Sequence, residues 1–129
     1  MAFPSLGGGY QFTDGNVNEP VLVIQSTPAA VSAAGTLTAA QLLAGIVVCS
    51  GTPGTQTLPT VALLEAALVN PKVDSGFEVS FINTAGSTLT LATGTGWTIV
   101  GTLTAATVTS ALFRARKTGD GAWTLYRVA

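Results

Sequence analysis

The side chains that usually carry out catalysis are scarce in this sequence of 129 residues. The chain contains no His and a single Cys, Cys49. Without His, neither a Ser-His-Asp triad nor a Cys-His pair can activate a nucleophile. Cys49 ends the apolar run that begins at Ile46, so we expect it to pack as a small hydrophobic residue. The sequence therefore excludes His-dependent nucleophilic catalysis, as well as any disulfide within one chain.

The acidic side chains are scattered and form no recognisable metal site. They are Asp14, Glu19, Glu65, Asp74, Glu78 and Asp120. No zinc-type grouping and no EF-hand spacing occurs, although Asp74 or Asp120 with loop carbonyls is an alternative calcium site. A hydrolase using two distant carboxylates is the one enzymatic alternative that remains. We predict that the chain is not an enzyme and uses no metal and no cofactor.

Glycine-rich loops that bind phosphate groups are also missing from the sequence. Neither a Gly-Lys-Ser/Thr loop nor a G-x-G-x-x-G fingerprint occurs. The Gly-x-Gly segments at 94–96 and 119–121 are typical of tight turns between strands. We therefore expect no nucleotide cofactor.

Three aromatic side chains near the C-terminus could form a platform on which sugar rings stack. They are Trp97, Trp123 and Tyr126. Large aromatic residues more often anchor a core or a protein interface. We expect the second role, and the sugar platform is the alternative.

Most of the cations lie close together near the end of the chain. Arg114, Arg116, Lys117 and Arg127 are four of the five cations. On a strand, Arg114 and Arg116 share one face. They form either a solvated strand face or ion pairs with Asp74, Glu78 or Asp120. The alternative is a docking face made of Arg114, Arg116 and Lys117. The net charge of −1 provides no long-range attraction to nucleic acid or to acidic membranes, so we predict neither as a partner.

The low overall charge is the most unusual feature of the composition. Charged residues make up 9% of the chain, whereas an average globular domain has about 25%. A monomer of this size normally relies on a charged surface to stay soluble. We infer that other subunits or partners cover part of the surface, as in an oligomer or an assembly.

The first 20 residues differ from the rest of the chain. They contain Gly, Asn and Pro together with isolated apolar side chains that follow no helix or strand period. Burying such a side chain contributes about 1.5–3 kcal/mol. We predict that residues 1–20 form an extended arm that binds a partner through Phe3, Leu6, Tyr10 and Phe12. An unstructured N-terminus is the alternative.

Residues 21–129 are predicted to form one β-rich domain with short helices near 38–44 and 59–69. Thr38 and Gln41 have the spacing of a capping box, and Gly45 suits the end of the first helix. For the second helix the expected N-cap is Thr57, with Pro59 in the first turn. The expected strands before the second helix are 21–25 and 46–50, with a connection over 28–35 and a turn over 51–54.

Strand signals become regular after residue 76. Apolar and polar residues alternate over 77–81, and further strands are expected at 87–92, 97–100, 107–116 and 122–128. Their spacing of roughly ten residues is typical of a meander or a Greek key. The predicted fold is mainly β, an antiparallel β-sandwich or jelly-roll-like single domain.

Three segments carry a resemblance to a known class of proteins: GFEVSFIN at 76–83, LTLATGTG at 89–96 and FRARKTGDGAWTLYR at 113–127. Over roughly residues 35–129 the chain resembles the β-module of tailed-bacteriophage virion proteins, found in capsid decoration (cement) proteins, head fibres and tail fibres. The resemblance implies a homotrimer on the capsid surface that binds the major capsid protein. No secretory signal is visible at the start of the sequence, so we expect synthesis in the host cytoplasm. The small size and the N-terminal arm favour a decoration protein that stabilises the head lattice. The alternative is a receptor- or carbohydrate-binding module of a tail fibre or spike.

Overall fold

The computed structural model describes residues 24–129, so the predicted arm (1–20) and most of the strand predicted at 21–25 lie outside the described residues. The described part is mainly β, as the sequence predicts. Its strands are β1 (Ala29–Thr36), β2 (Ile46–Thr57), β3 (Gly76–Asn83), β4 (Leu89–Ala92), β5 (Trp97–Val100), β6 (Thr104–Ala105), β7 (Thr109–Gly119) and β8 (Ala122–Arg127). The helices are α1 (Ala39–Leu43) and α2 (Val61–Ala67).

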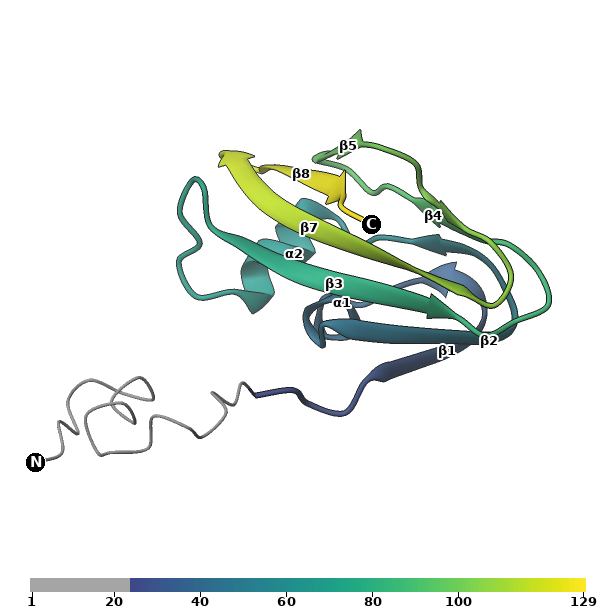
Figure 1. Cartoon of the computed structure of the whole chain (residues 1–129). Coiled ribbons are helices and arrows are strands. Elements are labelled where there is room, and N and C mark those ends of the chain that lie inside the picture. Colours follow the sequence, from purple (N-terminus) through teal and green to yellow (C-terminus); the bar gives the residue numbers. More distant parts are fainter. Residues whose placement is uncertain (1–23) are drawn as a thin grey trace, which may run out of the picture.

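The strands form one curled, mixed sheet in place of the predicted antiparallel sandwich (Figure 1). The strand order is β5-β8-β7-β3-β2-β4-β6, and β1 pairs with β2 outside this path. β2 runs parallel to β1, β3 and β4, and β5 runs parallel to β8. The sheet bends because the start of β2 pairs with β3, whereas its end pairs with β4. Among residues 24–129, only β7 and β8 form a hairpin between consecutive strands, so the meander, one of the two arrangements predicted, is wrong.

Two predictions in the first half of the domain are wrong. Residues 28–35, expected as a connection, are mostly β1, because β2 supplies a parallel hydrogen-bonding partner for a segment of small side chains. The turn expected at 51–54 lies inside β2, where the β1–β2 register shifts absorb its Gly and Pro residues. Ile24 and Gln25, the described end of the strand predicted at 21–25, lie outside any strand.

The capping box predicted for the first helix is confirmed. Thr38 Oγ1 accepts from the Gln41 amide at 3.1 Å, and the Thr38 amide donates to Gln41 Oε1 at 3.0 Å. Helix α2 is shorter than predicted, and its N-cap is Thr60 instead of Thr57. The difference arises because the Leu58 amide still donates to Ala92 of β4, which holds this segment on the sheet. No helix among residues 24–129 is long and apolar enough to cross a membrane.

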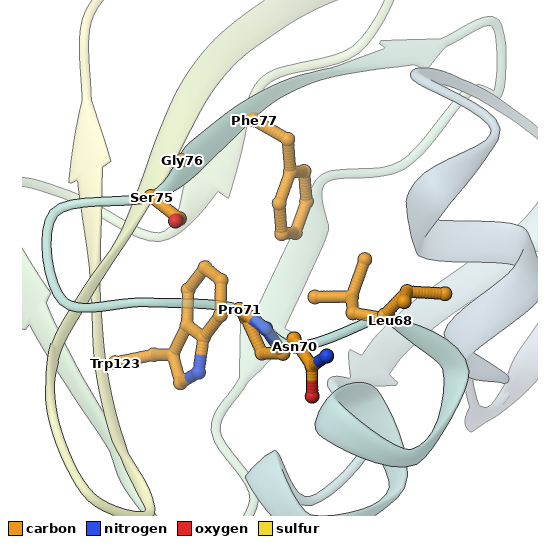
Figure 2. A pocket seen from close by; sticks show the side chains of 8 residues that line it. Leu68, Asn70, Pro71, Ser75, Gly76, Phe77 and Trp123 are labelled. Atoms are coloured by element: carbon orange, nitrogen blue, oxygen red, sulfur yellow. The ribbon is translucent and has the colours of Figure 1, made fainter.

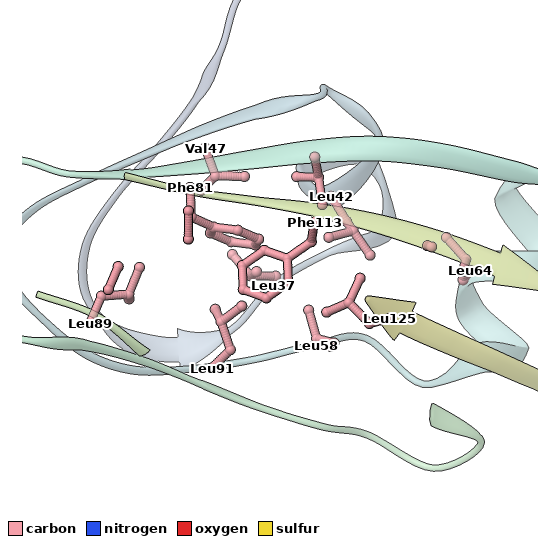
Figure 3. Close-up of a cluster of buried hydrophobic side chains, with 14 of the residues drawn as sticks. Leu37, Leu42, Val47, Leu58, Leu64, Phe81, Leu89, Leu91, Phe113 and Leu125 are labelled. Atoms are coloured by element: carbon pink, nitrogen blue, oxygen red, sulfur yellow. The ribbon is translucent and has the colours of Figure 1, made fainter. Parts of the chain in front are cut away.

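The core fills the inside of the curled sheet (Figure 3). Phe81 of β3 and Phe113 of β7 meet edge to face, with ring centroids 5.8 Å apart. Helix α2 contributes Val61 and Leu64, both buried, to the same cluster. The core therefore joins the helices to both ends of the sheet.

Candidate functional site

A buried lysine lies between the sheet and helix α2. Lys117 follows Phe113 and Ala115 on the inward face of β7, and its side chain is only 8% exposed. Its Nζ forms an ion pair with Glu65 Oε2, and the same oxygen accepts from Trp123 Nε1 at 3.1 Å. The Lys117 hydrogen bond, followed by the one from Trp123, lowers the pKa of Glu65 below its ordinary value. The ion pair with Glu65 compensates the buried charge of Lys117. Because the three residues come from α2, β7 and β8, the cluster connects these elements.

The lowered pKa of Glu65 makes the stability of the fold depend on pH. The folded state favours the ionised carboxylate, so this contribution is fully present above the ordinary glutamate pKa of about 4.3. It is lost as the pH falls through the lowered folded-state value. We expect Glu65→Gln to flatten the decline in Tm between about pH 7 and about pH 3, measured by circular dichroism. Glu78→Gln, at an exposed ion pair, is the matched control, and an unchanged acid profile in Glu65→Gln would contradict the prediction.

The three cations of the predicted docking face do not share one face. Arg114 and Arg116 point outward from β7, whereas Lys117 points inward and is buried. Arg114 pairs with Glu78 at 2.9 Å, directly across the β3–β7 ladder. Arg116 pairs with Asp74 at 2.7 Å. The two arginines therefore form the ion pairs with Glu78 and Asp74 that were predicted as the alternative to a docking face.

Arg116 also contacts an aromatic side chain. Its Nε and Nη2 donate to the Tyr126 hydroxyl at 3.1 and 3.0 Å. The hydrogen bond to Tyr126, followed by that to Asp74, raises the pKa of the Arg116 guanidinium. These contacts place Tyr126 in a polar network on the outer face of the β7–β8 hairpin.

The three aromatic residues of the sugar platform do not lie together on the surface. Trp123 is 1% exposed and packs inside the sheet against Phe77 and Trp97, with centroid separations of 5.8 and 6.2 Å. Trp97 Nε1 donates to the Pro59 carbonyl at 2.8 Å. Trp123 and Trp97 therefore act as core anchors, on the other side of the hairpin from the Arg116–Tyr126 network.

A small hollow lies next to this aromatic cluster, where the chain passes from α2 to β3 (Figure 2). Its volume is about 210 Å³. The lining residues are Leu68, Val69, Asn70, Pro71, Ser75, Gly76, Phe77 and Trp123. Ligand pockets usually enclose about 300–1,000 Å³. This hollow is smaller, and its size suits a single apolar side chain better than a small-molecule substrate.

The remaining chemical candidates are Cys49 and the acids. Cys49 is buried, and burial raises the pKa of its thiol, as expected for a packing residue. Asp74, one of the two alternative calcium ligands, is paired with Arg116. Within residues 24–129, no three His, Cys, Asp or Glu side chains come together in a way that could hold a metal ion.

Charge is distributed very unevenly over the described sheet. All charged residues from 24 to 129 lie in α2, β3, β7, β8 or the connections α2–β3 and β7–β8. Strands β1, β2, β4, β5 and β6 contain none. Of these, β1, β2, β4 and β6 are neighbours in the sheet, and we call these four the uncharged strands. A sequence signal for this feature exists, because no charged residue occurs between Glu19 and Glu65. Interface centres are depleted of charge, so the uncharged strands are the better candidate contact region.

Strand β1 is the most open part of the uncharged strands. Among residues 24–129 it pairs only with β2, and all of its side chains except Ala29 and Val31 are exposed. Edge strands are commonly protected by charge or Pro, which β1 lacks. This edge is not evident from the sequence, because the small side chains of residues 28–35 are typical of a connection.

A strained valine lies in the loop between β6 and β7. Val108 has φ +54° and is 78% exposed. A β-branched residue rarely adopts this left-handed conformation, which costs of the order of 1 kcal/mol or more. An exposed apolar side chain at such a position marks this loop, next to the uncharged strand β6, as a second candidate contact.

The predicted arm anchors Phe3, Leu6, Tyr10 and Phe12 lie outside the described residues. The chain matches no protein-family model, no curated protein and no solved structure.

Proposed function

We propose that the chain is a structural protein of a bacteriophage virion, a capsid decoration protein that binds and stabilises the head lattice. The observation that carries the proposal is the group of neighbouring uncharged strands, which contain no Asp, Glu, Lys or Arg. Such a surface can be buried against a large partner without desolvating charges, a step that costs several kcal/mol per ion. The sequence resemblance at 76–83, 89–96 and 113–127 supports the choice of a virion partner.

In this proposal the uncharged strands, the N-terminal arm and the charged outer face have different roles. The uncharged strands face the major capsid protein, and Phe3, Leu6, Tyr10 and Phe12 of the arm insert between neighbouring capsid subunits. Arg114 and Arg116 stay at the outer surface, where their ion pairs remain solvated. Bridging adjacent subunits adds buried area to contacts that are stressed by packaged DNA. A homotrimer on the capsid surface fits this role.

The proposal predicts where the chain is found and what its loss does. Phage particles are prepared from the phage that encodes this chain and from a mutant that lacks its gene. Their protein content is measured by quantitative mass spectrometry. We expect the chain at a fixed, high ratio to the major capsid protein, and earlier DNA release on heating in particles that lack it. A chain missing from purified particles would overturn the proposal. A few copies confined to tails would favour the tail-fibre alternative.

Binding to isolated capsids tests the arm separately. Deleting residues 2–19 should abolish co-sedimentation with capsids that lack the chain, while the circular dichroism spectrum of the domain is retained. Arg114→Ala, on the charged outer face, is the matched control and should bind as the full-length chain does. Unchanged capsid occupancy after the deletion would refute the role of the arm.

A further inference from the structure

We propose that residues 21–24 of one copy add as a strand to the free edge of β1 in a second copy, so that the chain assembles with itself by strand addition. The acceptor is the outer edge of β1, which has no strand partner among residues 24–129. Its exposed side chains, such as Ala30, Ser32 and Ala34, are small, so a second backbone can approach closely. Added strands gain main-chain hydrogen bonds along such an edge.

The donor is the most strand-like run in the N-terminal part of the chain. Residues 21–24 read Val-Leu-Val-Ile, a continuous apolar sequence that is typical of a strand buried on both faces. Ile24, where the described chain begins, is 100% exposed on its own molecule. Covering side chains of this kind contributes favourably to association.

The path of the chain directs the donor away from its own β1. Gln25 Nε2 donates to the Ala44 carbonyl at 2.7 Å, which fixes the chain beside the α1–β2 connection. Residues 25–28 contain no turn and lead outward from the start of β1 (Figure 1). For residues 21–24 to reach their own β1, the chain would have to reverse within this segment. The open edge of a second copy is therefore the acceptor that fits.

The absence of charge from both partners removes the usual barrier to such pairing. No Asp, Glu, Lys or Arg occurs between Glu19 and Glu65, a range that includes the donor and all of β1 and β2. Each copy has one donor and one acceptor, so the contact is head to tail and forms a closed ring when the rotation between copies closes.

The test uses the full chain and measures its mass by light scattering coupled to size exclusion. Wild type is expected to have the mass of two or more copies. Val23→Pro removes an amide donor from the added strand, and Ala30→Lys places a charge on the acceptor edge. Each variant alone is expected to be monomeric at concentrations where wild type is fully assembled. Thr98→Lys, on the exposed face of the edge strand β5, is the matched control and should keep the wild-type mass.

Mixing the two variants gives the most specific result. The Val23→Pro chain keeps an intact edge and the Ala30→Lys chain keeps an intact donor, so equal amounts should form a complex with one copy of each, identified by native mass spectrometry. A monomeric wild type, an assembled single variant or a mixture that stays monomeric would overturn the inference. Circular dichroism checks folding, and Leu22→Pro with Ser32→Lys replaces the first pair if either variant is unfolded.

This inference does not depend on the virion role. A chain that assembles by strand addition but is missing from particles would support the inference and refute the proposed function. A chain that is monomeric in solution but present in particles would refute the inference and support the proposed function.

Discussion

Replacing Trp123 with Ala is expected to lower the free energy of unfolding by about 3–5 kcal/mol. Trp123 is 1% exposed, and its ring packs between Phe77 and Trp97 inside the curled sheet. Truncation removes these contacts and leaves a cavity next to the hollow already present at Phe77. It also removes the Nε1–H group that donates to Glu65 Oε2, so the Lys117–Glu65 ion pair loses this supporting hydrogen bond. Since domains are stable by only about 5–15 kcal/mol, the loss is a large share of the total.

The measurement is urea denaturation followed by far-ultraviolet circular dichroism. Trp123→Phe keeps an aromatic ring but loses the indole N–H, so it should fall between wild type and Ala. Leu63→Ala, at an α2 side chain that is 60% exposed, is the control and should change stability by about 0.5 kcal/mol or less. A loss below about 1 kcal/mol for Trp123→Ala would contradict its place in the core.

Replacing Asn83 with Ala is expected to cost about 2–4 kcal/mol. Asn83 ends β3, is 1% exposed, and its Nδ2 donates to the carbonyls of Ser87, Ala105 and Ala106 at 2.8, 3.1 and 3.1 Å. Its Oδ1 accepts from the Ala85 amide at 3.0 Å. The side chain thus holds the β3–β4 and β6–β7 connections together. Without it, several buried backbone groups lose their partners, each at a cost of about 1–3 kcal/mol.

Two further variants make the Asn83 prediction specific. Asn83→Asp keeps the acceptor for Ala85 but has no donor for the three carbonyls, so it should destabilise the fold at least as much as Ala at neutral pH. Ser87→Ala leaves the Ser87 carbonyl in place and alters only an exposed side chain, so its unfolding curve should match wild type. An Asn83→Asp variant with the unfolding curve of wild type would show that the hydrogen bonds donated by the Asn83 amide do not stabilise the fold.

The stability network and the proposed contact surfaces lie in different parts of the fold. Trp123, Lys117 and Glu65 join α2 to the charged strands, whereas the open edge of β1 lies beyond β2 in the sheet. Substitutions at Ala30 or Ser32 can therefore test assembly without disturbing this network.

Several features were predictable because they depend on residues close together in the chain. The Thr38–Gln41 capping box spans one helical turn, and its hydrogen bonds are present in the structure. Alternation over 77–81 correctly places Val79 and Phe81 on the buried face of β3. The shared outward face of Arg114 and Arg116 also follows from strand alternation, whereas their partners Glu78 and Asp74 come from a distant part of the chain.

Features that depend on distant partners could not be read from local pattern. Residues 28–35 looked like a connection because Ala, Ser and Gly have little strand preference, and only parallel pairing with β2 makes them a strand. Lys117 looked like a surface cation, but the period of β7 turns it inward, where Glu65 of α2 compensates its charge. Neither partner is near in sequence, so no window of residues could have indicated the pairing.

The sequence alone determined that this chain lacks His, has a single Cys in an apolar run and carries little charge, because these are properties of its composition. It also determined that the chain forms mainly strands, because short-range periodicity indicates them. The tertiary structure decided where that chemistry lies. By pairing β2 with β1, β3 and β4 it made one curled mixed sheet, gathered the charge on β3, β7 and β8, and left β1 at an open edge. Long-range backbone pairing depends on the whole chain, which is why only the folded structure reveals the edge on which the assembly proposal depends.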